Sequence, residues 1–317
     1  MISGVALPVL AALLGFCLAR ANSCTVASVK RVVVEKRWDW LLGLAAAASS
    51  GAVTLAVLLS IPGAGFVPPE HHGLGWGPIV GGLLLGVGAW INRACMLGSI
   101  SRIAEGDTNF LLTLAGLALA LLAWPRLYLL PEEPSSYTIR NLSALPSAQA
   151  LAILAILTLG WAFWRLKEGR NRAMLYLMAA GIVGAVLFAG SPQWSYLSSI
   201  GRGLRGSLFS LGVWTDLAAI AIFAGAWLST WLASRFSVLR PRVGKALLCL
   251  AGGFLMGLGA QEVPGGNDAL LLWTIPGAAV YGLIAYAVMI GTIAFCMMAT
   301  GGRRSVLEGR AAAKAEQ

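Results

Sequence analysis

Two cysteines carry the most reactive chemistry that this sequence offers. Cys24 and Cys95 each lie where an apolar run gives way to polar residues. Cys24 is followed by Lys30, and a nearby cationic group makes a thiol more reactive. Cys95 lies between Arg93 and Ser99, where helix-end N–H groups and an arginine would favour an anion. The alternatives are structural, because a buried free cysteine is usually a small apolar residue and the polar residues around Cys24 also suit a helix cap.

The break that holds Cys95 has a counterpart in the second half of the chain. Residues 81–89 recur at 252–260, where six of the nine positions are identical and the offset is 171 residues. Each copy is apolar and leads into a polar interruption. Transport proteins build sites at mid-membrane depth from such paired broken helices, so the repeat predicts a substrate path that includes Cys95.

A second pair of stretches, residues 22–33 and 191–207, is too polar to span a membrane and too apolar to form simple loops. The same offset aligns Cys24 with Ser195. We expect both stretches to be short re-entrant helices, because non-helical backbone at membrane depth is tolerated only where protein or water surrounds it. Four breaks, two in each half, would then converge near the centre.

The break in the second half offers polar groups in place of a thiol. Asn267 and Asp268 follow two glycines, and we interpret them as a helix cap that faces the path, with capping alone as the alternative. Arg93 has no obvious partner nearby in the sequence, and a charge at this depth usually faces a cavity or a partner. The residues predicted to line the path are Cys24, Arg93, Cys95, Ser99, Ser195, Asn267 and Asp268.

The composition places these residues inside a membrane. Of the 317 residues, 58% are hydrophobic and 11% are charged, whereas soluble domains carry about 25% charged residues. The chain could not cover a water-facing surface, so it is an integral membrane protein that contacts the lipid bilayer. The net charge of +10 does not indicate nucleic acid as a partner. Most basic residues lie in short tethers between apolar runs, as they do on the cytoplasmic side of membrane proteins.

The apolar runs that could cross a bilayer core of ~30 Å number about nine. They lie at roughly 3–19, 41–62, 78–103, 108–130, 148–165, 173–190, 211–234, 245–260 and 279–300. Placing the basic clusters in the cytoplasm puts the N-terminus outside and the C-terminus inside, so the two copies of the repeat run in opposite directions.

The predicted fold class follows from these runs and their orientation. We expect an all-α integral membrane protein with about nine transmembrane helices plus short re-entrant helices, in two inverted repeats around a central path. The chain would form a single membrane domain over 1–317. Its first repeat would cover about 1–130 and its second about 173–300, joined by a connecting span at about 148–165.

Several classes of chemistry lack their sequence motifs. The five cysteines match no zinc or CxxC spacing, and His71 and His72 are adjacent, unlike a metal-binding pair one helical turn apart. No Walker A, HExxH or GxSxG sequence occurs, which argues against a hydrolase or an ATP-driven motor. We therefore expect a transport protein that is not an enzyme and that needs no metal or other cofactor.

The break in the first half resembles a signature of the YeeE/YedE family of bacterial inner-membrane sulfur transporters. That family reads approximately Gly-Gly-Cys-x-x-Gly, followed by an Arg and a Glu-Gly pair. This chain reads Arg93-Ala94-Cys95-Met96-Leu97-Gly98, then Arg102 and Glu105-Gly106. The resemblance covers most of the chain and implies two related halves with short inserted helices. In the second half many members read Gly-Gly-Cys-Asn, whereas this chain reads Gly265-Gly266-Asn267-Asp268 and lacks the third cysteine.

The resemblance implies that thiosulfate passes between cysteine S–H groups, with Cys95 as the central station and Cys24 as the cytoplasmic one. Asn267 would replace the outer thiol and offer an amide donor instead. A location in the bacterial inner membrane and a small cytoplasmic sulfur-carrier protein as partner are implied as well. The leading hypothesis is therefore a permease or channel for uptake of thiosulfate or a related sulfur-containing anion. The alternatives are a membrane thiol oxidoreductase, a transporter of another sulfur or selenium species, and a structural or sensory subunit.

Overall fold

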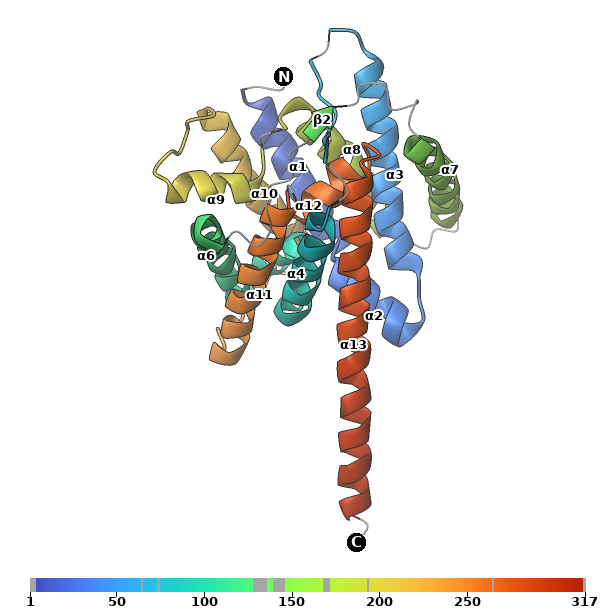
Figure 1. Ribbon diagram of the computed structural model, residues 1–317, viewed down its shortest axis with the longest axis vertical. Helices are drawn as coiled ribbons and strands as arrows, with labels where there is room; N and C mark the ends of the chain where they lie inside the picture. Colours follow the sequence, from blue (N-terminus) through green and yellow to red (C-terminus); the bar gives the residue numbers. More distant parts are fainter. Residues whose placement is uncertain are drawn as a thin grey trace.

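The computed structural model describes residues 4–63, 65–72, 75–127, 136–138, 146–167, 172–192, 194–263 and 265–315. These residues form a helical bundle with one small two-stranded sheet (Figure 1). The first half contains α1 (Ala6–Ala21), α2 (Thr25–Glu35), α3 (Asp39–Ser60), α4 (Gly77–Asn92), α5 (Met96–Ala104), the 3₁₀ turn η1 (Thr108–Phe110) and α6 (Leu111–Leu127). Strand β1 (Glu70–His72) pairs antiparallel with β2 (Ser136–Thr138).

The second half repeats this order of long and short helices. After the connecting helix α7 (Pro146–Lys167) come α8 (Arg172–Gly190), α9 (Tyr196–Leu204), α10 (Val213–Leu232), α11 (Val243–Glu262), α12 (Asn267–Ala269), the π-helical turn η3 (Leu270–Thr274) and α13 (Val280–Ala315). The short helices begin 171 residues apart, α2 at Thr25 and α9 at Tyr196, α5 at Met96 and α12 at Asn267. In Figure 1, α2 and α9 lie on opposite sides of the bundle.

The prediction of an all-α membrane protein is confirmed. Among the described residues, eight helical segments are long and apolar enough to cross a membrane. The ninth expected span, 148–165, falls within α7, whose described apolar stretch is the shorter Ala152–Arg165. The run expected at 78–103 is broken into α4 and α5, with a polar turn between them. The repeat limits of about 1–130 and 173–300 stay a prediction.

Glycines hold the two duplicated helices α4 and α11 against each other. A Cβ atom on Gly88 would lie 2.7 Å from the carbonyl oxygen of Gly252, and one on Gly259 would lie 2.7 Å from that of Gly81. Small residues let membrane helices approach this closely. Because Gly81 meets Gly259 while Gly88 meets Gly252, the two helices are antiparallel, as an inverted repeat requires.

The antiparallel crossing brings the two breaks together. The 16 residues of α4 span about 24 Å, so α4 and α11 end at opposite ends of their shared interface. After each helix the chain turns back toward the middle. The backbone N–H of Met96, at the start of α5, donates to Oδ1 of Asn267, at the start of α12, over 3.0 Å. The starts of the two short helices therefore meet at the centre of the bundle.

We predict that Gly88→Ala destabilises the protein. The added methyl group would press on the Gly252 carbonyl, and overpacking of this kind typically costs about 1–3 kcal/mol. Thermal unfolding of purified protein in detergent measures the effect. Gly160→Ala is the matched control, because a Cβ atom there would have no neighbour within 4 Å. Equal melting temperatures for the two variants would contradict the close crossing of α4 and α11.

Candidate functional site

The two thiols singled out in the sequence meet at the starts of two short helices. Cys24 is the N-cap residue of α2, and Cys95 is the N-cap residue of α5. Their Sγ atoms are 3.9 Å apart, and both side chains are buried. Seventy-one positions separate the two cysteines along the chain. The structure thus brings together residues whose proximity no sequence spacing reveals.

The sulfur of Cys95 accepts hydrogen bonds from two different helices. The backbone N–H of Gly98 donates to it over 3.4 Å, which is the usual N-cap arrangement with sulfur in place of oxygen. The backbone N–H of Thr25 donates to the same Sγ over 3.3 Å from the start of α2. One sulfur atom therefore satisfies free N–H groups at two helix starts, where partial positive charge collects.

Gly98 makes room for the pair of thiols. A Cβ atom at this position would lie 2.5 Å from Sγ of Cys24 and 2.9 Å from its Cβ. Any side chain here would push Cys24 away from Cys95. This is a specific physical reason for glycine at the last position of the Cys-x-x-Gly pattern.

A network of polar side chains fixes the turn before Cys95. Nδ2 of Asn92 donates to the carbonyl oxygen of Ala94 over 2.7 Å and to Oγ of Ser99 over 2.9 Å. Ser99 in turn donates to the carbonyl oxygen of Cys95 over 3.0 Å, and Thr113 donates to Oδ1 of Asn92 over 2.7 Å. All of these side chains are buried. Ser99 thus holds the backbone of the break, a role that the sequence did not assign to it.

The break in the second half faces the first one through Asn267. Its side chain is fully buried, and Oδ1 accepts from the backbone N–H of Met96 while Nδ2 has no partner among the described residues. The N-cap residue of α12 is Gly266, so Asn267 stands one position beyond the place that Cys95 takes in α5. Asp268 is also buried, and its Oδ1 lacks a hydrogen-bond partner within the described part of the chain.

Two other predicted path residues make no hydrogen bond to either thiol within the described part of the chain. Arg93 is the C-cap residue of α4 in a left-handed conformation, with φ of 62°, and its side chain is exposed. Ser195 caps α9, and its Oγ accepts from the backbone N–H of Leu197 over 3.2 Å. The structure therefore gathers Cys24, Cys95 and Asn267 into one cluster and leaves Arg93 at its edge. Tyr196, next to Ser195, is buried and lies near Cys95 and Asp268.

Sequence reasoning missed two residues that support the cluster. Tyr286 of α13 and Thr25 share a hydrogen bond of 2.9 Å between their hydroxyl groups, and Thr25 also donates its N–H to Cys95.

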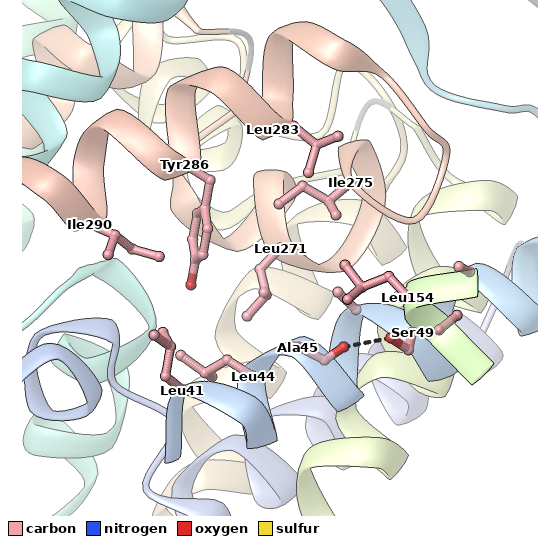
Figure 2. A pocket seen from close by; sticks show the side chains of 13 residues that line it. Leu41, Leu44, Ala45, Ser49, Leu154, Leu271, Ile275, Leu283, Tyr286 and Ile290 are labelled. Carbon is pink, nitrogen blue, oxygen red and sulfur yellow. Dashed lines mark hydrogen bonds between the residues drawn. The ribbon is translucent and has the colours of Figure 1, made fainter. Parts of the chain in front are cut away.

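Tyr286 forms part of the wall of a cavity of about 210 Å³ between α3, α7, η3 and α13 (Figure 2). The lining is almost entirely apolar, and the hydroxyl of Ser49 is bonded to the carbonyl oxygen of Ala45. The cavity does not suit an anion, so the candidate site is the thiol cluster beside it.

The cluster offers weak hydrogen-bond donors and acceptors in a desolvated place. In the part of the chain that the structure describes, no three His, Cys, Asp or Glu side chains are grouped so as to hold a metal ion. Thiol S–H groups, an amide and backbone N–H groups can bind an anion without a strong fixed cation. The arrangement suits transient contact with a small anion that carries sulfur or oxygen.

We predict that the oxidant diamide joins Cys24 to Cys95. A disulfide joins Sγ atoms about 2.05 Å apart, and these two atoms start 3.9 Å apart. Peptide mass spectrometry of oxidised protein should find this bond and none between Cys17 and Cys249. Gly98→Ala should lower the yield because the new methyl group displaces Cys24. An unchanged yield in Gly98→Ala would contradict the packing described above.

Comparison with known proteins is consistent with this geometry. No curated protein matches the chain. A family model described as sulphur transport matches residues 20–195, which is more than half of the chain and includes both breaks of the first half. Cys24, Cys95 and Ser99 all lie within the matched region. The chain is a multi-pass membrane protein that belongs to the sulphur transport family.

Proposed function

We propose that this protein is a permease of the bacterial inner membrane that takes up thiosulfate or a closely related sulfur oxyanion. The observation that carries the proposal is the position of Cys95. Its sulfur lies between the N-terminal N–H groups of α2 and α5 and beside a second thiol, where the two breaks meet. A family of sulphur transport proteins provides the substrate class.

The cluster offers weak hydrogen-bond donors, which suit a path for a dianion. Thiosulfate cannot cross hydrocarbon unaided, and conduction requires sites that bind the ion and also release it. The S–H groups of Cys24 and Cys95 are weak donors, so neither would trap the ion. Arg93 lies exposed beyond the buried cluster, where its charge would attract the anion rather than grip it.

The order of donors supports a relay. In the proposed path the anion first meets Nδ2 of Asn267, which has no partner among the described residues. It then meets the thiol of Cys95 and after that the thiol of Cys24. The Asn267 side chain reaches the N–H of Met96, the residue after Cys95, and the two thiols are 3.9 Å apart. Successive donors this close would pass an anion along without a step through bare hydrocarbon.

The proposed orientation has the N-terminus in the periplasm and the C-terminus in the cytoplasm. The N-terminus lies at one end of the bundle, and α2 and the C-terminus lie toward the other (Figure 1). Helix α2 carries Lys30 and Arg31, and positive charge favours the cytoplasmic side. A small cytoplasmic sulfur-carrier protein as partner would dock on this side, and that partner stays a prediction from the family resemblance.

The separation of the thiols also favours a second candidate, a membrane thiol oxidoreductase. Sulfur atoms 3.9 Å apart are close enough to cycle between a dithiol and a disulfide. Cys24→Ser separates the two functions, because a serine hydroxyl still offers a hydrogen-bond donor but cannot form a disulfide. Retained thiosulfate uptake in Cys24→Ser supports the permease. The enzyme would be identified if the wild type showed no thiosulfate uptake and Cys24→Ser lost quinone-linked thiol oxidation.

We predict that the chain restores thiosulfate-dependent growth to a bacterial strain that lacks its own sulfate and thiosulfate uptake, and that Cys95→Ala does not. Removing the sulfur leaves the N–H groups of Gly98 and Thr25 without their acceptor and deletes the central donor. Growth rate and uptake of labelled thiosulfate measure the effect at equal membrane levels of each variant.

The matched control is Cys17→Ala, which removes another buried thiol from the apolar part of α1. It should support growth at close to the wild-type rate. Near-normal uptake by Cys95→Ala would refute the role of the cluster. Failure of a well-inserted wild type to rescue growth would refute thiosulfate as the substrate and direct attention to other sulfur or selenium species.

A further inference from the structure

Asp268 is a buried carboxyl group whose partners are incomplete. Its side chain is 6% exposed, and among the described residues Oδ1 has no hydrogen-bond donor. Two other carboxyl groups of low exposure are paired with cations. Asp216 accepts from Arg202 and from the backbone N–H of Phe209, and Asp107 accepts from Lys245. The fold therefore supplies cations to its other buried aspartates and leaves Asp268 without one.

Within the described residues no positively charged side chain faces Asp268, whose carboxyl group accepts only from backbone N–H groups at the start of α12. Cys95, at the start of α5, and Tyr196 of α9 are the titratable groups that lie near it. The turn η3, which packs against α12, contains no titratable residue. Arg102, at the far end of α5, is paired with Glu105. No ion pair with Asp268 occurs within the described residues.

A carboxylate in this position would obstruct the proposed path. An ionised carboxylate without a cation is costly to bury, and a charge at membrane depth usually serves transport. Ionised Asp268 would also repel a dianion that reached the neighbouring Asn267. The protonated group removes both difficulties, because a carboxylic acid carries no charge and donates one hydrogen bond to an oxyanion.

A proton carried with the anion would also reduce the opposing effect of the membrane potential. A potential of about 100 mV, negative inside, lowers the equilibrium concentration of a free dianion inside the cell on the order of a thousandfold. A proton that travels with each anion removes one of the two charges that move against the potential. It also draws on the inward proton gradient.

We propose that uptake is coupled to protons through Asp268, an inference that rests on the proposed permease function. The carboxylate takes one proton from the periplasmic side, forming an O–H bond, and donates it as a hydrogen bond to the passing sulfur oxyanion. When the anion leaves toward Cys95, the O–H bond breaks and the proton is released to cytoplasmic water. No electrons are transferred, and Asp268 returns to its ionised form.

The test uses the purified full-length chain in liposomes that contain a trapped pH-sensitive dye. Added thiosulfate should acidify the lumen of wild-type vesicles, and an acidic exterior should drive accumulation of labelled thiosulfate. Asp268→Asn should lose both responses. Asp268→Glu should restore them. Glu262→Gln is the matched control and should behave as the wild type. It removes the acidic group of another carboxyl that has an oxygen without a partner among the described residues, at the end of α11.

The outcomes separate this inference from the permease function. Thiosulfate exchange by the wild type without acidification would overturn proton coupling and leave the permease intact. Acidification by Asp268→Asn would overturn the role of Asp268. If that variant loses exchange as well, recovery of exchange and acidification in Asp268→Glu supports the proposal, and no recovery overturns it. Absence of any thiosulfate flux in the wild type would refute the permease, and proton coupling with it.

Discussion

The need to satisfy backbone N–H groups inside a membrane governs this structure. A helix that begins within the bundle exposes N–H groups where no water can reach them, and each must find a partner. Here the partners are a sulfur and an amide. Cys95 accepts from Gly98 and Thr25, and Asn267 accepts from Met96. The same positive helix starts that require these caps are suited to an anion, so the stability of the breaks and the proposed substrate path depend on the same few atoms.

The glycine crossing of α4 and α11 determines where those atoms meet. Because α4 and α11 are antiparallel and in contact from Gly81 to Gly88, their C-terminal ends lie far apart. The chain that follows each helix then turns back to the centre of the bundle from opposite sides. The hydrogen bond from Met96 to Asn267 joins two residues that occupy the same position in the two copies. The bond is not reciprocated, because the methionine side chain offers only a weak sulfur acceptor in place of an amide oxygen. Duplication therefore produced a symmetric frame with a chemically asymmetric centre.

The sequence predicts the frame well because its signals are local. Repeated glycines, apolar runs and polar interruptions predict the broken helices, and the structure has short helices at both pairs of expected breaks. The residues that support the site are instead brought together by contacts between helices that are far apart in the sequence. Tyr286 and Thr25 are 261 positions apart, so their contact depends on how α13 packs against α2. Arg93 illustrates a further limit, because the left-handed turn that exposes its side chain is a property of the folded backbone.

Asn267 stands where the family resemblance implies a third thiol, and an amide there would change the chemistry of one half of the proposed path. On the side of the first repeat, soft sulfur groups would contact the sulfur end of thiosulfate. On the other side, Asn267 and Asp268 offer an amide N–H and a carboxyl O–H, which are harder donors suited to the oxygen atoms of the ion. Thiosulfate has one sulfur end and one oxygen-rich end, so its two ends would match the two different sides of this centre. In the proposed path this arrangement would give the anion a preferred orientation, and the neighbouring carboxyl group of Asp268 would be a site that can carry a proton.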